Sequence, residues 1–96
     1  MKEFSGEKRT EALRLMAYEL ITEWKKRNGE NITKLALDSG MFLLYQRLKE
    51  NQQLDVHLPY WWGKYGVEVD WEQIPGVEFT MKAVGAGGIV DDRIKM

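Results

Sequence analysis

The stretch from Asn31 to Asn51, NITKLALDSGMFLLYQRLKEN, constrains the fold more than any other part of the chain. Plotted at 100° per residue, its apolar side chains cover every side of a helix, so we expect burial all round. Gly40 divides the segment. A helix through Gly40 is destabilised by about 1 kcal/mol relative to alanine, whereas a break would make Asp38-Ser39-Gly40 a turn. One helix and two crossing helices therefore both remain open, with Asn31 as the expected cap.

The first part of the chain, from Ser5 to Asn28, is predicted to form an amphipathic helix. Its apolar side chains recur at spacings of three and four, which is the period of one helical face. Ser5 can cap the start, and Asn28-Gly29 supplies a left-handed stop. The last turn is basic, which complements the helix dipole and leaves phosphate contact as the alternative role. The basic residues are Lys25, Lys26 and Arg27.

The second half of the chain has the alternating pattern of β-strands. Residues 54–58 alternate apolar and polar side chains and predict a short strand that Pro59 ends. Residues 67–71 and 77–83 alternate in the same way, and Ile74-Pro75-Gly76 between them is typical of a type II turn. These two runs predict a β-hairpin with one apolar and one acidic face. His57, the only histidine, lies on the polar side of the first strand, where exposure is expected rather than metal binding.

An aromatic segment, YWWGKYG at residues 60–66, precedes this predicted hairpin. In an extended segment alternate residues face opposite sides, so Trp61 and Tyr65 share one side while Tyr60, Trp62 and Lys64 share the other. One set is expected to pack against the helices. The other set is either core filling or a binding platform for a peptide or a base. An exposed set would suit a protein partner or a homodimer.

Within the apolar stretch, ITKLALDSGMFLLYQRL resembles a helix-turn-helix. Ala36 and Gly40 match the small residue and the glycine of that motif, with apolar neighbours on either side. The sequence departs from the pattern at Gln46 and Lys49, where the motif has buried apolar residues. A base-reading helix also exposes polar side chains, whereas residues 42–44 are apolar here. The resemblance implies a winged helix-turn-helix domain that contacts DNA.

A second resemblance covers residues 32–69. The combination LLYQRL and LPYWWGKYG is similar to an arrangement found in winged-helix-like prokaryotic proteins, including the Panacea-type antitoxin domain. In those proteins proline usually follows the Tyr-Gly pair, and here Val67 stands in its place. This resemblance implies a regulatory role.

The chain ends in a glycine-rich loop and a short mixed tail. Gly85-Ala86-Gly87-Gly88 lacks the Lys-Ser/Thr of a phosphate-binding P-loop, so a flexible loop is expected and no cofactor is predicted. Asp91 and Asp92 are adjacent and would face opposite sides of a strand, which disfavours a shared metal site. Because the chain stops soon after this loop, a fragment of a longer protein is one interpretation.

Composition and charge narrow the classes of function. Ninety-six residues with 44% hydrophobic side chains make one domain, 1–96, with one modest core. The absence of cysteine excludes disulfides and thiolate metal sites and fits a cytoplasmic location. No apolar run reaches the roughly 18–20 residues of a membrane span, so no membrane partner is expected. The net charge of −1 argues against strong unspecific nucleic-acid binding.

The predicted fold is α+β: N-terminal helices, then a short strand and a β-hairpin, in the order of a winged-helix domain. The sequence contains no recognisable nucleophile–base pair, metal-ligand cluster or cofactor-binding loop, so no enzyme activity and no small-molecule ligand are predicted. The leading hypothesis is a regulatory binding module of winged-helix type that contacts DNA or a protein, with residues near Gln73 as the wing. The alternative is an interaction or homodimerisation domain with no nucleic-acid role. The four candidate nucleic-acid contacts are Lys34, Arg47, Lys49 and Lys64, and the candidate partner contacts are Tyr60, Trp62 and Lys64. The predicted core is Leu13, Met16, Leu20, Trp24, Leu35, Leu44, Leu48, Val69, Trp71 and Phe79.

Overall fold

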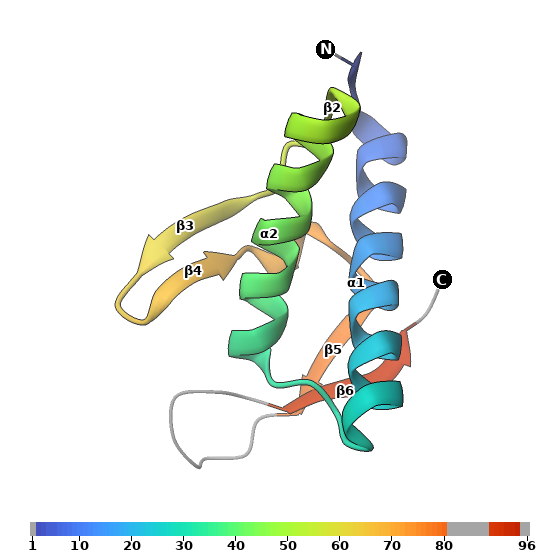
Figure 1. The fold of residues 1–96 in the computed structure, drawn as a ribbon, viewed down its shortest axis with the longest axis vertical. Helices are drawn as coiled ribbons and strands as arrows, with labels where there is room; N and C mark the ends of the chain where they lie inside the picture. The colour runs from blue at the N-terminus through green and yellow to red at the C-terminus, as the bar shows by residue number, and fades with distance from the viewer. Residues whose placement is uncertain (1, 81–88, 95–96) are drawn as a thin grey trace.

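The computed structural model describes residues 2–80 and 89–94, with side chains up to Val77, and has an α+β fold (Figure 1). The predicted α+β class is therefore confirmed. In chain order the elements are β1 (Lys2–Glu3), α1 (Gly6–Asn28), α2 (Lys34–Gln52), β2 (Leu54–Asp55), β3 (Tyr60–Gly63), β4 (Gly66–Val69), the 3₁₀ helix η1 (Trp71–Gln73), β5 (Val77–Thr80) and β6 (Ile89–Ile94). The described strands pair two by two: β1 with β2 in parallel, β3 with β4 and β5 with β6 antiparallel.

Helix α1 forms where the apolar period predicts it. It ends as expected, because Gly29 adopts a left-handed φ of 72° and donates its N–H to the Lys25 carbonyl at 2.8 Å. Ser5 precedes the first turn in an extended conformation, but its side chain makes no capping hydrogen bond. One face of α1 is buried against α2 and the strands: Leu13, Met16, Ala17 and Ile21.

Helix α2 is continuous through Gly40, so the two-helix alternative is wrong. Gly40 lies inside the helix and faces α1, where a Cβ would meet the Leu20 side chain at 3.4 Å, an ordinary contact distance. The cap is Thr33 rather than Asn31, because the Thr33 hydroxyl accepts a hydrogen bond from the Ala36 N–H at 3.2 Å. Burial all round the helix was also a wrong expectation, since Leu43 is 57% exposed.

The core lies between the two helices and the segments that cross them. Its most completely buried side chains include Leu13, Leu37, Met41 and Ile74. Of the ten predicted core residues, Leu13, Met16 and Val69 are buried, and Leu20, Trp24, Leu44, Leu48 and Trp71 pack partly buried against them. Leu35 is 44% exposed, so its placement in the core was wrong. The Phe79 side chain lies outside the described residues.

The connection after α2 is a corner rather than a five-residue strand. Strand β2 ends at Asp55, and His57 adopts a left-handed φ of 48°. Three hydrogen bonds hold this strained residue: its N–H donates to Asp55 Oδ1 at 2.8 Å, and its carbonyl accepts from Arg9 Nε at 2.9 Å and from Arg9 Nη2 at 2.7 Å. The corner buries Val56 and Leu58 together with Asp55, which the alternation had placed on the exposed side.

The predicted hairpin across Ile74-Pro75-Gly76 is wrong. Strand β4 pairs with β3, and β5 pairs with β6. The chain turns too early for the predicted pairing because Asp70 caps η1: its carboxylate accepts hydrogen bonds from the Glu72 N–H at 3.2 Å and from Gln73 Nε2 at 2.8 Å. Gln73, expected at the tip of a wing, instead lies within 3.5 Å of the Arg9 guanidinium of α1.

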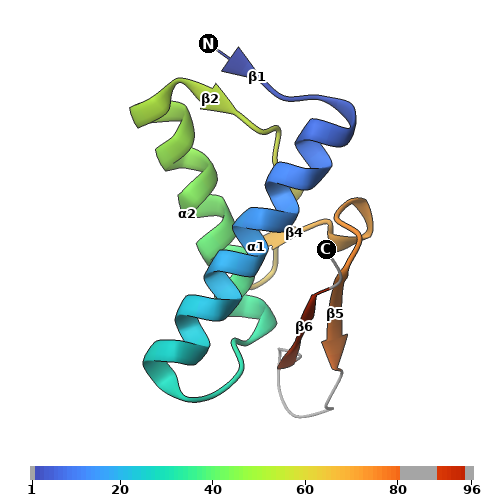
Figure 2. The ribbon, with the colours of Figure 1, turned by 90° about the vertical axis from the view of Figure 1, so that its right-hand side faces the viewer.

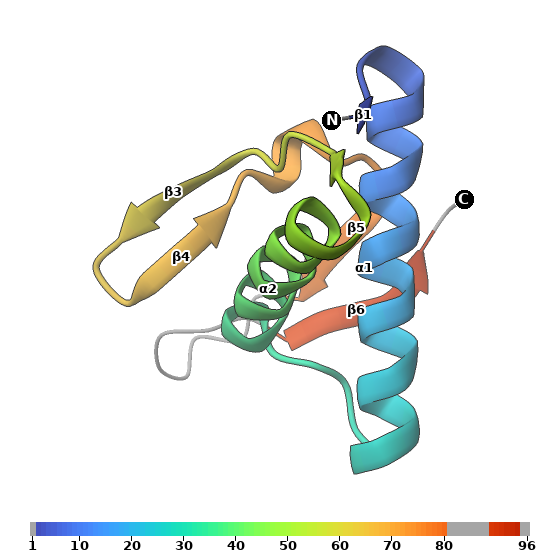
Figure 3. The ribbon, with the colours of Figure 1, turned by 45° about the horizontal axis from the view of Figure 1, so that its top comes forward.

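The two described hairpins leave the helix pair in different ways. Figure 2 shows the β5–β6 hairpin beside the helices, and β6 packs against α1. The β3–β4 hairpin extends outward beyond α2, with its turn at residues 64–65 farthest from α1 (Figure 1). Strand β4 packs against α2, and Figure 3 shows β4 between β3 and that helix. The backbone of β4 therefore lies nearer to α2 than that of β3 does.

Candidate functional site

The outer face of α2 and strand β3 together form a cluster of aromatic rings. Phe42 and Tyr45, three residues apart on α2, meet Tyr60 and Trp62 of β3. The Phe42 ring centroid lies 5.0 Å from that of Tyr60 and 5.2 Å from that of Trp62, both in edge-on geometry. Tyr45 lies 6.1 Å from Tyr60. These are the distances at which ring pairs attract one another. The aromatic cluster, defined as these four residues, attaches β3 to the helix.

The register of the hairpin divides its side chains between two faces. Trp62 stands opposite Val67, and both belong to the face that meets α2. Trp61 stands opposite Glu68 on the other face, where the indole Nε1 donates to Glu68 Oε2 at 2.7 Å. The predicted alternation of Trp61 against Tyr60 and Trp62 is therefore confirmed. Gly63 leaves room for this contact, because the Glu68 carboxylate occupies the place of its missing Cβ.

The aromatic side chains of the hairpin remain largely in contact with water despite these contacts. Trp62 is 66% exposed, Tyr65 63% and Trp61 51%. These side chains lie on both faces of one short hairpin, and such a concentration of exposed aromatic rings is more than the single apolar residues scattered over an ordinary surface. Core filling accounts for only part of the aromatic content. We call the six residues Phe42, Tyr45, Tyr60, Trp61, Trp62 and Tyr65 the aromatic surface.

A shallow cavity of about 180 Å³ adjoins the aromatic cluster. Its walls combine rings with polar and charged groups of both signs, among them Lys49 and Glu50. Lys49 Nζ lies 5.2 Å from the centroid of the Tyr45 ring, a cation–π distance. A cavity of this size, lined by aromatic rings and by polar and charged groups, suits one inserted side chain better than a whole cofactor. The cavity is lined by Phe42, Tyr45, Gln46, Lys49, Glu50 and Tyr60.

The four cations expected to contact nucleic acid do not form one stripe. Lys34 begins α2, and its Nζ forms an ion pair with Asp38 Oδ2 at 2.8 Å. Lys49 lies near the other end of the helix, roughly 20 Å away at 1.5 Å per residue. Arg47 is exposed on the same half of α2 as Lys49. Lys64 lies at the hairpin turn with its Nζ 5.7 Å from the Tyr65 ring. Only Arg47 and Lys49 lie close together in the chain, and Lys64 adjoins the aromatic surface instead.

Asp38 is a buried carboxylate that the sequence did not single out. It is 2% exposed, and its Oδ1 accepts a hydrogen bond from Trp71 Nε1 at 2.6 Å while Oδ2 pairs with Lys34. Buried charges are stable only when they are paired and hydrogen-bonded. Asp38 thereby ties η1 to α2 just after the hairpin, which is a structural task. The Lys34–Asp38 spacing of four residues was the available signal.

A second group of titratable side chains, also missed, joins β1 to β2. His57 Nε2 lies 3.5 Å from Glu3 Oε1, and His57 Nδ1 lies 3.7 Å from Asp55 Oδ2. One ligand atom from each residue lies within 4.8 Å of the others, which is close enough to surround a cation. The two ring nitrogens face different carboxylates, Nε2 toward Glu3 and Nδ1 toward Asp55. No signal in the sequence links Glu3 to a corner 52 to 54 positions later.

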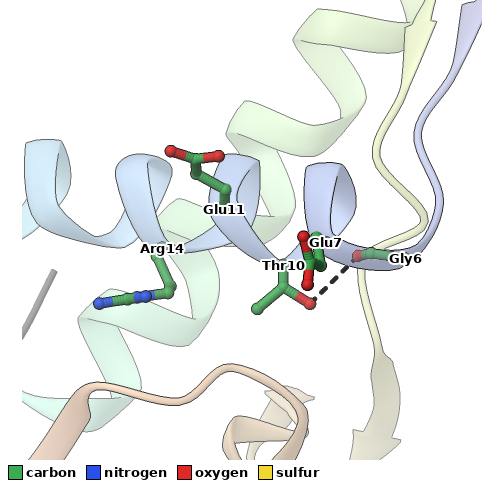
Figure 4. Close-up of a pocket in the computed structure, with 5 residues that line it drawn as sticks. All are labelled: Gly6, Glu7, Thr10, Glu11 and Arg14. Carbon is green, nitrogen blue, oxygen red and sulfur yellow. Dashed lines mark hydrogen bonds between the residues drawn. The ribbon is translucent and has the colours of Figure 1, made fainter.

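A hollow of about 390 Å³ lies beside the first half of α1 (Figure 4). The Thr10 hydroxyl donates to the Gly6 carbonyl at 3.3 Å, and Arg14 Nε is buried with no hydrogen-bond partner among the described residues. Figure 4 shows Glu11 on the side of the helix opposite Thr10 and Arg14. The polar groups do not converge on one point, so the hollow offers no catalytic constellation.

The aromatic surface is therefore the strongest candidate site among the described residues. In that part of the chain no helix is both long and apolar enough to cross a membrane. Comparison with protein-family models, with curated proteins and with solved structures finds no match to this chain.

Proposed function

We propose that this chain is a small, non-enzymatic binding module that contacts a protein partner through its aromatic surface. The observation that supports it is the exposure of two adjacent tryptophans, Trp61 at 51% and Trp62 at 66%, on the β3–β4 hairpin. Covering the exposed half of one such ring removes roughly 100 Å² from water, which stabilises a complex by about 2.5 kcal/mol. Tryptophan and tyrosine are enriched at the centres of protein interfaces for this reason.

The charges around the aromatic surface also favour a protein over DNA. Its neighbours have both signs: Lys49 and Lys64 accompany Glu50 and Glu68. A DNA-binding surface of winged-helix type instead needs a continuous basic stripe, because phosphate contacts supply most of its affinity. DNA contact through Lys34, Arg47, Lys49 and Lys64 remains the alternative proposal, and Arg47 is the best placed of these to support it.

The experiment compares matched double variants of the immobilised chain. Trp61→Ser/Trp62→Ser removes the two exposed indoles, and Leu15→Ser/Tyr18→Ser removes two comparably exposed apolar side chains from α1, at 47% and 45%. The immobilised wild type and both variants are each exposed to a protein mixture that also contains free wild-type chain. The amount of each protein that they retain is then measured. We expect the hairpin variant to lose the retained proteins and the α1 variant to keep them. Circular dichroism verifies that both variants are folded.

Two results would overturn the proposal. One is equal retention of the same proteins by the wild type and the Trp61→Ser/Trp62→Ser variant. The other is tight binding of mixed-sequence duplex DNA that falls steeply with salt and is weakened by Arg47→Ala, since that behaviour identifies phosphate contacts.

A further inference from the structure

The backbone of β3 presents unused hydrogen-bonding groups along its outer edge. The Asp70 N–H donates to the Pro59 carbonyl at 2.8 Å, which makes Pro59 and Asp70 a hydrogen-bonded pair at the base of the hairpin. In an antiparallel ladder such pairs alternate with non-bonded ones. Trp61 therefore bonds to β4, whereas the N–H and C=O groups of Tyr60 and Trp62 point away from it. The edge offers two donors and two acceptors in one row.

Nothing in the described residues protects this edge. The sheet has two strands, and no described strand pairs with the outer side of β3. Proteins usually guard such an edge with lysine, proline, a bulge or a covering element. Strand β3 reads Tyr-Trp-Trp-Gly and is regularly paired with β4, so it has none of these within its length. Figure 3 shows β4 between β3 and α2, which leaves the outer side of β3 away from the helix.

We propose that the partner of the aromatic surface is a second copy of this chain, joined to it by antiparallel pairing of β3 with β3. The inference rests on the proposed function and names its partner. The register is centred on Trp61, so that Tyr60 of each copy stands opposite Trp62 of the other. In this register each Tyr60 and the Trp62 opposite it in the other copy form a hydrogen-bonded pair, which exchanges two N–H to C=O bonds. The outward N–H and C=O groups of both residues are therefore all used. The two hairpins become one four-stranded sheet.

The side chains make this register self-complementary. The two Trp61 residues meet at the two-fold axis as a non-bonded pair, where Cα atoms come within about 4.5 Å of each other and rings interact most strongly. On the α2 face, Tyr60 of one copy lies beside Trp62 of the other and extends the aromatic cluster. In this register Lys64 at each turn lies at the Pro59 end of the other copy's β3.

A second copy also accounts for the hairpin itself. A two-stranded sheet is marginally stable in water, whereas four strands with an apolar face are stable. The β3–β4 hairpin has few contacts with the body beyond α2, so pairing with an identical hairpin supplies what its own chain does not. A strand from a different protein would need its own aromatic side chains at matching positions. A second copy of this chain has them by symmetry.

The first test uses the absence of cysteine from the chain. Trp61→Cys places two thiols at the two-fold axis, within the Cα range that a disulfide needs. Leu43→Cys and Tyr65→Cys are the controls, because both positions are at least as exposed as Trp61 but lie away from the axis. In oxidised glutathione we expect Trp61→Cys to form covalent dimer at least about tenfold faster than either control, since pairing raises the local thiol concentration.

The second test separates the backbone edge from the side chain. Trp62→Pro removes an outward N–H and leaves the β3–β4 ladder intact, whereas Trp62→Ser removes the same indole and keeps the N–H. By sedimentation equilibrium over a wide concentration range, we expect the dimer dissociation constant of Trp62→Pro to exceed that of Trp62→Ser by about tenfold or more, because two symmetric hydrogen bonds are lost.

Each contrary result has a distinct meaning. A wild-type chain that stays monomeric at every concentration overturns the proposal that the partner is a second copy. If that chain still retains another protein, and the retention depends on Trp61 and Trp62, the proposed function is supported. A dimer that cross-links faster through Leu43→Cys than through Trp61→Cys overturns the register. Equal dissociation constants for Trp62→Pro and Trp62→Ser overturn the pairing of edges.

Discussion

The α1–α2 pair and the β3–β4 hairpin are both rich in large apolar side chains, yet they use them in opposite ways. Leu13, Leu37 and Met41 are fully buried between the helices, whereas Trp62 and Tyr65 are more than 60% exposed. The helices enclose a core because each presents one face to the other and to the crossing strands. The hairpin has a helix on only one side. Apolar content alone therefore does not identify a core. Whether an apolar side chain is buried depends on how many other elements pack around the element that carries it.

The largest effect that tests this comparison is expected at Leu37. Leu37→Ala leaves a cavity in the helix pair and should lower the free energy of unfolding by about 2–5 kcal/mol. Leu43→Ala, six positions along the same helix and 57% exposed, should change it by less than about 0.5 kcal/mol. Urea denaturation of both variants measures the difference. Similar losses at the two positions would contradict the assignment of α2 faces.

A smaller effect is expected where the two regions are joined. Asp38→Ala removes the acceptor of the Trp71 indole N–H and the partner of Lys34, and we expect it to lower stability by about 1–3 kcal/mol. Asp38→Asn has the same size and keeps an acceptor oxygen for the Trp71 indole, so it should lower stability less. It is the matched control that removes the charge alone. Equal losses in thermal unfolding would assign the effect to charge rather than to the hydrogen bond.

Local signals predicted the parts of the fold that depend on neighbours in sequence. The start and end of α1 followed from its apolar period and from Asn28-Gly29, which act within one turn. The pairing of β4 did not follow, because its alternation fits either neighbouring strand. The deciding feature was the cap that Asp70 places on η1, together with a two-residue turn flanked by Gly63 and Gly66.

The candidate site was predictable in identity but not in exposure. The aromatic segment and its alternation were visible in the sequence, and Tyr60 and Trp62 do share a face. Their exposure depends on which side of β3 a helix covers, and that is a tertiary property. The link of Glu3 to His57 depends likewise on parallel pairing of β1 with β2, which joins residues far apart in the chain.

A change of opposite sign is expected at Gly40. Gly40→Ala removes the conformational cost of glycine inside a helix, and its Cβ would meet the flexible Leu20 side chain at an ordinary contact distance of 3.4 Å. We therefore expect a gain of about 0.5–1 kcal/mol in the free energy of unfolding. A turn with positive φ at this position would instead make alanine destabilising. The sign of the change in chemical denaturation thus distinguishes the continuous helix from the helix-turn-helix.

The smallest change in stability is expected at the hairpin, and it sharpens the comparison most. Trp61→Ser removes a side chain that is 51% exposed and makes one exposed hydrogen bond, to Glu68. At concentrations low enough to keep the chain monomeric, the free energy of unfolding should change by no more than about 0.5 kcal/mol. Trp24→Ser is the control, since the Trp24 ring packs partly buried against the core and its loss should cost more. A large loss at Trp61 in the monomer would mean that the hairpin tryptophans hold the fold together. A negligible loss would leave their exposed surface free to bind a partner.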